Sequence, residues 1–445
     1  MIRVCRAGGY VVSAALLLSV APVSWAQDPQ PEKITLTEAI RRAQANEPIF
    51  AAAVAAGRSA KIDSYLAKAA LLPSATYHNQ MLYTQPNGQT NQGGQAGTQA
   101  SPIFIANNTV HEYTSQAVIN ETVGLKGIAN AQVASAVAAR AQAEAEVARR
   151  GLVSAVVNLY YMVYVAARKQ TLMEEGLAEA QSFAEITQKR EAGREVARAD
   201  VVKAQLQLQG RQRDIADAKL AADKARLELA VLLFPDPRTP YVTDDPQNPP
   251  ELPTRDEVNK LAATNNPEIR SALADLAAAN ASVRSAKAGY LPDLGLNFTY
   301  GIDAPQFAKN GPDGVRNLGY SISGTLDIPV WDWFSTQKKI QQSQIQRNVA
   351  KVSLTAAQRR LIANLEESYA EAAAARNQLS LLEQSAQTAA ESLRLTRLRY
   401  AAGESTVLEV VDAQNALLTA QTAQADGVVR YESALSALQI LTGTL

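Results

Sequence analysis

The chain has 445 residues, with 43 basic and 43 acidic side chains and a formal net charge of zero. Nucleic-acid-binding proteins usually carry a clear basic excess, so this balance argues against a nucleic-acid partner. Cys5 is the only cysteine, which excludes a disulfide within the chain and a cluster of cysteine ligands for a metal.

Residues 1–26 predict a secretory signal peptide. Arg3 and Arg6 form a short positive region, Gly8 to Val20 is almost wholly apolar, and small residues lead to a cleavage site after Ala26. The apolar run is shorter than the ~20 residues that a membrane-spanning helix needs. We therefore expect this segment to be removed and the mature protein to be exported.

The rest of the chain contains no continuous apolar span, so a helical membrane protein is not expected. A β-barrel would escape this test, because its strands alternate apolar and polar residues. Cys5 lies inside the leader and does not follow its cleavage site. We therefore expect no acylated cysteine of a lipoprotein and no thiol chemistry in the mature chain.

The mature chain has the pattern of a duplicated unit. The interval from Pro48 to Pro73 equals that from Pro267 to Pro292. Proline suits the first turn of a helix and the residue after its end, so each pair of prolines is expected to bracket one Ala-rich helix. The motifs that recur in the same order are Asn46-Glu47-Pro48-Ile49 with Asn266-Pro267-Glu268-Ile269, Ala192-Gly193 with Ala402-Gly403, and Asp200 to Gln205 with Glu409 to Gln414.

These repeats divide the chain into four segments. We expect the signal peptide at 1–26, a first unit at 27–235, a Pro-rich connector at 236–254 and a second unit at 255–445. Each unit is expected to run helix, strand, loop, strand, long helix, glycine turn and long helix. The prolines of the connector predict that it contains no regular element.

Two stretches of the second unit alternate strictly between apolar and polar residues, which predicts strands with one apolar and one polar face. The apolar positions are Leu294, Leu296, Phe298, Tyr300 and Ile302, then Leu318, Tyr320, Ile322, Leu326 and Ile328. The first unit has a weaker version, with Tyr77, Met81 and Tyr83, then Tyr113, Ala117 and Ile119. Each run is about 10 residues, the length that crosses a bilayer when tilted.

The long helices are predicted at 128–192, 199–234, 335–402 and 407–442, where proline is absent and Ala, Gln, Glu, Arg and Leu dominate. The first would extend roughly 97 Å at 1.5 Å per residue. Helices of this length imply antiparallel coiled-coil packing, with alanines allowing close approach. Four strands per chain cannot close a barrel, for which about eight are needed, so the chain is expected to oligomerise through two, three or four copies.

Several motifs recur in a fixed order along the mature chain. They are Leu36-Thr37-Glu38-Ala39-Ile40, the Asn-x-Pro helix starts, the Leu-Pro pairs before the strands, Ile328-Pro329-Val330-Trp331-Asp332, and Tyr400-x-x-Gly403 followed by Val407 to Gln414. In these motifs the chain resembles the outer-membrane efflux protein family, whose best-known member is TolC, over essentially its whole mature length. The resemblance implies a mainly α fold with membrane β, in which three copies form one α/β barrel of 12 strands (three times four) and long helices.

The resemblance also implies a function and partners. The homotrimer would lie in the outer membrane lipid of a Gram-negative cell and extend into the periplasm. It would act as the exit duct of a tripartite efflux or type I secretion system, receiving cargo from an inner-membrane transporter through a periplasmic adaptor protein. The sequence does not identify the cargo, which could be a drug, a metal ion, a peptide or a protein.

The resemblance places a gate at the periplasmic helix tips, at Asp200, Tyr400, Glu409 and Asp412. Glu409 and Asp412 share a helical face, and in a three-fold assembly would form rings of carboxylates that filter cations; the alternative is that they are solvated surface acids. Ser405 stands where the best-known member has its gate arginine.

We expect Arg194 or Arg198 to replace that gate arginine, because the first unit has one extra residue between its tip glycine and the following helix. The turns Ala192-Gly193-Arg194 and Ala402-Gly403-Glu404 correspond to the family's adaptor-docking tips. The glycines would also serve to end the helices in a left-handed conformation.

Trp331, Trp333 and Phe334 are predicted to lie at the periplasmic membrane interface, where aromatic rings favour the headgroup level, or to pack between barrel and helices. His78 and His111 are the only histidines, and no motif of a metal site, nucleophile or phosphate loop occurs. We expect no catalysis, no cofactor and no resident metal. The alternative function is a trimeric coiled-coil surface adhesin or a structural envelope protein, which the duplicated strand pairs fit poorly.

Overall fold

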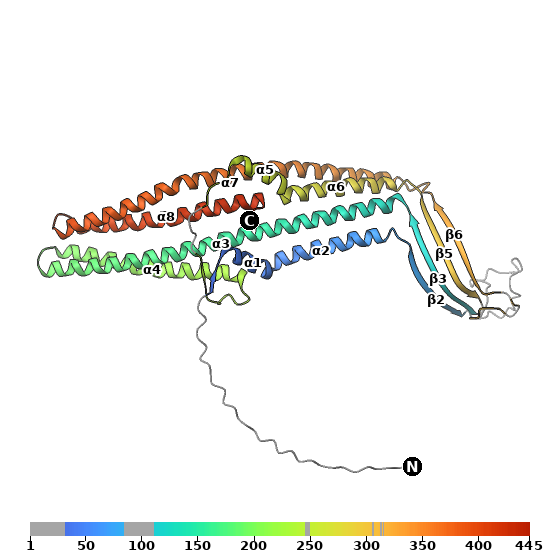
Figure 1. Cartoon of the computed structure of the whole chain (residues 1–445), viewed down its shortest axis with the longest axis horizontal. Helices are drawn as coiled ribbons and strands as arrows, with labels where there is room; N and C mark the ends of the chain where they lie inside the picture. The colour runs from blue at the N-terminus through green and yellow to red at the C-terminus, as the bar shows by residue number, and fades with distance from the viewer. Residues whose placement is uncertain (1–31, 84–110, 245–249, 305–306, 312–313, 315) are drawn as a thin grey trace, which may run out of the picture.

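A computed structural model describes residues 32–83, 111–244, 250–304, 307–311, 314 and 316–445. The expected signal peptide, including Cys5, and most of the loop between the first two predicted strands lie outside these residues. The described chain is elongated: the helices run along its long axis, a four-stranded sheet bends away at one end, and two helical hairpins end at the other (Figure 1).

The two halves of the chain contain corresponding elements in the same order. The first half has β1 (Glu32–Ile34), α1 (Leu36–Asn46), α2 (Pro48–Ala69), β2 (Ser74–Tyr83), β3 (His111–Val123), α3 (Leu125–Ala192) and α4 (Arg198–Leu233). After β4 (Tyr241–Thr243), the second half has α5 (Arg255–Asn265), α6 (Pro267–Ala288), β5 (Asp293–Ala304), β6 (Leu318–Asp327), α7 (Ser335–Ala401) and α8 (Val407–Thr442). Helices α2 and α6 both have 22 residues, and α4 and α8 both have 36.

Two details differ from the sequence prediction. The helix before each strand pair has a further 11-residue helix in front of it, α1 or α5. The two helices separate at Glu47 and Asn266, which are extended because each precedes a proline. In addition, the connector contains β4, so the expectation of no regular element there is wrong. Its prolines leave Tyr241–Thr243 free to pair with β1 in parallel.

The sheet has the order β2-β3-β5-β6, and all of its pairs are antiparallel. Directly opposed residues lie on the same face. One face has Ile119, Phe298 and Ile322 in a row, whereas the adjacent row on the other face has Asn120, Asn297 and Ser323. The alternation read from the sequence is therefore confirmed as one apolar and one polar face.

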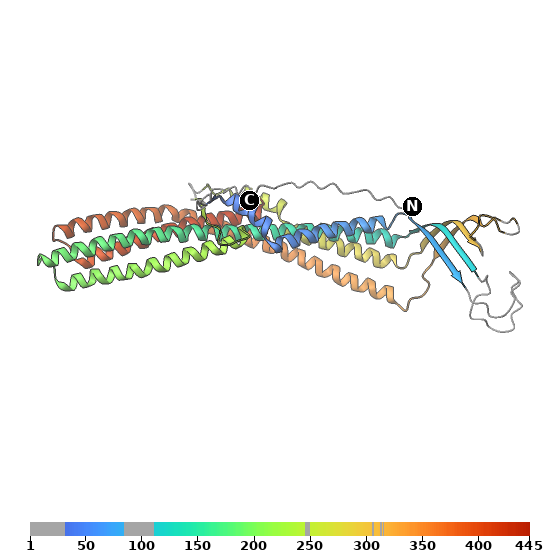
Figure 2. The same cartoon turned by 90° about the horizontal axis from the view of Figure 1, so that it is seen from below.

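The helices form a wall one helix thick, which can be followed in Figures 1 and 2. Near the sheet, α3 packs between α2 and α6, and α6 packs against α7. In the other half, α3 packs between α4 and α8, and α8 packs against α7. The edges of the wall are thus α2 and α4 on one side and α7 on the other.

Helix α3 is, among the described residues, the one helix long and apolar enough to cross a membrane by length and composition. The sequence analysis recognised no such span. Its apolar residues, including Val153, Val156 and Val157, are buried in a cluster with Ile34 of β1 and Leu229 of α4. This cluster lies in the middle of the molecule, and packing within one chain buries 39% of the apolar stretch.

Candidate functional site

The α3–α4 and α7–α8 turns have the same backbone geometry. Three amide-to-carbonyl hydrogen bonds close each turn, from Gly193, Arg194 and Glu195 in the first and from Ala402, Gly403 and Glu404 in the second. The left-handed residue is Arg194 in the first turn (φ 62°) and Gly403 in the second (φ 81°). The expectation that Gly193 is left-handed is therefore wrong.

The same geometry corrects the alignment of the repeats. Arg194 corresponds to Gly403, so the extra residue expected in the first tip disappears. Six expected adaptor-docking residues are all exposed at the end of the molecule: Ala192, Gly193, Arg194, Ala402, Gly403 and Glu404.

Arg190 of α3 bridges the two hairpins. Its Nη1 donates to the carbonyl oxygen of Tyr400 at 2.6 Å, and its Nη2 donates to that of Ala401 at 2.8 Å. These carbonyls belong to the last turn of α7, where the helix dipole favours a cation. The guanidinium also lies 4.8 Å from the centre of the Tyr400 ring, and Glu195 pairs with its Nε at 3.1 Å.

Tyr400 is buried where the two hairpins meet. Its side chain is 5% exposed, its ring centre lies 5.2 Å from that of Phe183, and its hydroxyl lies 3.4 Å from the hydroxyl of Thr187. Val407 and Val410 of α8 complete this apolar cluster. The structure therefore places Tyr400, which the sequence analysis selected, in contact with the arginine that bridges the hairpins.

The arginines expected to replace the missing gate arginine do not bridge the hairpins within one chain. Arg198 lies 3.7 Å from Glu191 of its own hairpin, and Arg194 makes no ion pair among the described residues. Arg190 makes that bridge instead. The corrected repeat alignment pairs Arg190 with Arg399, which is another arginine near the end of a long helix. This repeated arginine was the signal in the sequence that could have identified Arg190.

Glu409 has a local structural role. It accepts hydrogen bonds from the backbone N–H and hydroxyl of Thr406 and from the Ser405 hydroxyl, and so completes a capping box at the start of α8. These bonds, with a weaker effect from Arg399 3.6 Å away, lower the pKa of Glu409. Asp412 is exposed, one helical turn further along.

Asp200 is half-buried in the first turn of α4. It lines a small pocket at the tips together with Arg190, Tyr400 and Ser405. The structure thus brings Asp200 and Tyr400 together, whereas Asp412 faces solvent within one chain.

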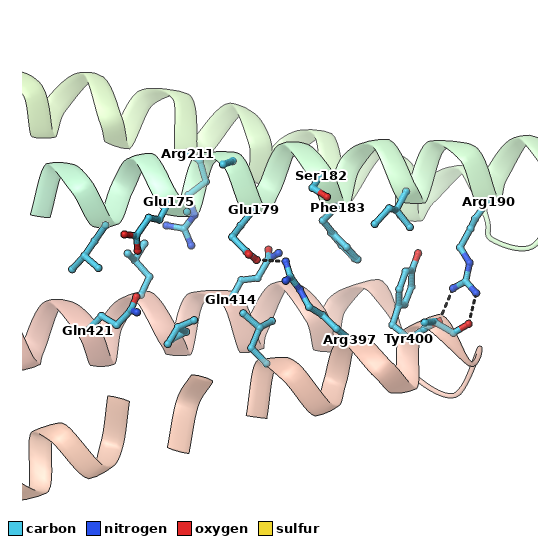
Figure 3. Close-up of a pocket in the computed structure, with 18 residues that line it drawn as sticks. Glu175, Glu179, Ser182, Phe183, Arg190, Arg211, Arg397, Tyr400, Gln414 and Gln421 are labelled. Carbon is cyan, nitrogen blue, oxygen red and sulfur yellow. Dashed lines mark hydrogen bonds and ion pairs between the residues drawn. The ribbon is translucent and has the colours of Figure 1, made fainter. Parts of the chain in front are cut away.

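A larger cavity of about 740 Å³ lies between α3 on one side and α7 and α8 on the other (Figure 3). Across it, Arg397 of α7 forms an ion pair with Glu179 of α3. Beside it, Gln207 and Arg211 of α4 both donate to Asn415 of α8. The hairpins are therefore joined at several levels, and sequence reasoning identified none of these residues.

The turn between β6 and α7 carries an exposed aromatic group. The ring of Trp331 meets those of Trp333 and Phe334 at 5.7 and 5.3 Å, and the three side chains are 63%, 82% and 58% exposed. Trp333 and Phe334 are both left-handed, with φ of 56° and 62°, which is rare for bulky residues. Within one chain, these three rings therefore do not pack between the sheet and the helices, which was the alternative expected from the sequence.

Comparison with known proteins finds similarity to one family. A model of the family described as outer membrane efflux protein matches residues 258–444. The pyoverdine export outer membrane protein OpmQ of Pseudomonas aeruginosa is 25% identical over 397 residues, which are 87% of this chain and 80% of that protein. The second half of the chain thus matches the outer membrane efflux protein family.

Two further proteins are similar to this chain. The outer membrane protein TolC of Escherichia coli is 24% identical over 177 residues, or 38% of this chain and 36% of that protein. The CmeC outer membrane channel of Campylobacter jejuni superposes with a TM-score of 0.76 and 16% identity over 92% of this chain and 85% of that chain. The last comparison establishes the fold, which is that of the channel.

Proposed function

We propose that this chain is the outer-membrane exit duct of a tripartite efflux or type I secretion system in a Gram-negative cell. It passes cargo from a periplasmic adaptor and an inner-membrane transporter to the exterior, and it catalyses no reaction. The observation that carries the proposal is the open wall of the fold: a sheet with one apolar and one polar face continues into a layer of helices one helix thick.

The sheet edges support assembly into a homotrimer. Within the described residues, strands β2 and β6 each have one unpaired edge, and in lipid each unsatisfied backbone group costs several kcal/mol. Pairing β6 of one copy with β2 of the next removes these edges. Three four-stranded copies give a barrel of 12 strands, with the apolar face toward the outer-membrane lipid and the polar face toward the channel.

The edges of the helical wall support the same assembly. Helix α2 exposes Ile62 and Tyr65 at 59% and 71%, and α7 exposes Ile345 and Val349 at 65% and 61%. Burying such apolar rows is worth about 25 cal/mol per Å². In the trimer these edges pack against one another. Trp331, at the end of the sheet, then marks the periplasmic membrane interface with its aromatic neighbours.

The hairpin tips form the periplasmic gate in this proposal. Arg190 and Tyr400 hold the two hairpins of one chain together, and Asp200 lies in the same pocket. The exposed carboxylates of Glu409 and Asp412 line the constriction as rings that bind cations. The exposed turns around Gly193 and Gly403 dock the adaptor.

The repeats have a matching explanation. We propose that units 27–235 and 255–445 arose by duplication, with the connector 236–254 joining them in the equatorial region. The equal lengths of the corresponding helices support this view.

Cysteine cross-linking tests the assembly. The only natural cysteine is Cys5, so pairs introduced on the outer strands, such as Thr76→Cys with Ser321→Cys and neighbouring pairs along β2, report contacts between copies. We expect cross-linked dimers and trimers in outer membranes and no larger species, because a closed ring has no free edge. Cross-linked species larger than a trimer would favour the adhesin. Release of the protein from membranes as a soluble rod would favour it too.

A further inference from the structure

The four helices that meet the sheet each carry an exposed lysine close to it (Figure 1). Lys68 and Lys287 lie in the last turns of α2 and α6, and Lys126 and Lys338 lie in the first turns of α3 and α7. Within the described residues, none of the four forms an ion pair. The four strands of the sheet contain no lysine or arginine. Positive charge is therefore concentrated at the level where the helices and the sheet join.

The helix dipole explains only two of these lysines. A cation stabilises the C-terminal end of a helix, where Lys68 and Lys287 lie, but not the N-terminal end, where Lys126 and Lys338 lie. Lys68 and Lys287 also occupy the same place in both units, four residues before the leucine of a Leu-Pro pair. What all four lysines share is their level along the molecule, which is also that of the exposed Trp331 ring in the β6–α7 turn.

The carboxylates near this level have other positions or partners. Asp332 accepts a hydrogen bond from the backbone N–H of Thr336 at 2.7 Å, at the start of α7. Asp293 and Asp327 oppose each other on the polar face of the sheet, which faces the channel in the proposed assembly. Among the described residues, Glu121 is the one carboxylate on the apolar face at this level, against four lysines on the helix ends.

A pocket of about 440 Å³ lies between the end of α2 and the start of α3, a volume within the range of about 300–1,000 Å³ that small-molecule sites have. Its lining is mostly apolar, with Leu71, Ile128, Ala131 and Ala136, and Lys68 is its only charged member. Ile128 is 43% exposed, so the apolar lining is open to a ligand from outside the chain. One exposed cation above an apolar surface suits a molecule with an anionic head and an apolar tail.

We propose that this junction binds anionic phospholipids of the membrane. The lysines at the helix ends hold the phosphate, and the α2–α3 pocket holds the upper part of an acyl chain beside Lys68. Lysine suits this role because its stem packs along apolar surface while its amine reaches a polar head group. The placement of this level at the membrane surface rests on the proposed function, whereas the pocket and its lysine do not.

Native mass spectrometry of the purified mature protein in detergent measures lipid binding directly. Phosphatidylglycerol is the anionic probe, and phosphatidylcholine with the same acyl chains is the zwitterionic comparison. Each lysine near a head group contributes about fivefold to the affinity for anionic lipid. We therefore expect phosphatidylglycerol to bind more tightly than phosphatidylcholine by at least about fivefold, Lys68→Gln to remove about fivefold of its affinity, and Lys68→Arg to retain it.

Two further variants separate the site from general effects of charge. Lys224→Gln is the matched control, because Lys224 is an exposed lysine of α4 outside the pocket, and it should not change binding. Ala136→Leu fills the pocket and leaves Lys68 in place, so it should weaken the binding of both lipids.

Three results would overturn the proposal. They are equal affinity of the wild type for the two lipids, equal affinity of the wild type and Lys68→Gln for phosphatidylglycerol, and complete displacement of the lipid by inorganic phosphate, which would indicate an adventitious ion only. Each of these results, in a protein that still conducts, would leave the proposed duct intact. Lys68-dependent binding of phosphatidylglycerol by a protein that forms no channel would uphold the lipid site and refute the proposed function instead.

Discussion

Arg190→Ala should open the periplasmic end of the channel. The substitution removes two hydrogen bonds to the last carbonyls of α7, at 2.6 and 2.8 Å, and a cation–π contact at 4.8 Å. A hydrogen bond from a charged donor is worth about 1.5–3 kcal/mol, and a partly exposed cation–π contact about 0.5–1 kcal/mol. The Arg190 side chain is 21% exposed, so we take the lower ends of these ranges, which together give about 3.5 kcal/mol per chain.

A change of about 3.5 kcal/mol multiplies the ratio of open to closed tips by roughly 300. Single-channel recording in planar bilayers measures this ratio as a rise in conductance or in open time. Arg190→Lys should give an intermediate value, because an ammonium cannot reproduce the two-pronged contact of a guanidinium.

Arg194→Ala and Arg198→Ala are the matched controls at the same tip, because neither residue joins the hairpins within one chain. Both should conduct like the wild type. Unchanged conductance in Arg190→Ala, or an increase in Arg198→Ala equal to it, would refute the assignment of the bridge to Arg190.

Three further predictions concern other parts of the chain. The capping bonds lower the pKa of Glu409, so they stabilise α8 above pH 4.5, and this stabilisation is lost as the pH falls below 4.5. Glu409→Ala should therefore fray the start of α8, which hydrogen exchange at pH 7 measures. If Glu409→Ala also relieves the block by divalent cations, Glu409 belongs to the gate as well. Burial raises the pKa of Glu432, so stability should fall as the pH rises above 4.5, and Glu432→Gln should melt higher at pH 8 but not at pH 4. A Cβ at Gly301 on β5 would lie 2.2 Å from the Ser115 carbonyl oxygen, so Gly301→Ala should distort the sheet and reduce heat-resistant oligomers on gels. Gly295 lies on the same strand and its Cβ would meet Thr325 at an ordinary 3.7 Å; equal loss in Gly295→Ala would contradict this.

Much of the fold was predictable because its signals are local and repeated. Proline spacing placed α2 and α6, alternation placed the strands, and the long runs without proline placed α3 and α7 within a few residues of their ends. The short strands β1 and β4 were not predictable, because each has three residues and forms only by pairing across the chain. Tyr160 holds that pairing, since its hydroxyl donates to the Ile34 carbonyl oxygen at 3.0 Å.

The candidate site was less predictable than the fold. Tyr400 was found through its place in a motif, but its partner Arg190 lies 210 positions away in sequence, and only packing of the hairpins brings them together. Glu409 was predicted as a gate residue, but the structure shows that its carboxylate also caps its own helix. Sequence spacing identifies which face a residue occupies, but not which neighbour that face meets.

Single-channel recording of the purified mature protein in planar lipid bilayers tests the central proposal most directly. An exit duct with an acidic constriction should give discrete, cation-selective conductance steps. Divalent cations should block these steps, and Asp412→Ala should relieve the block. If the folded protein purifies as an elongated soluble rod and shows no conductance, it is not a channel.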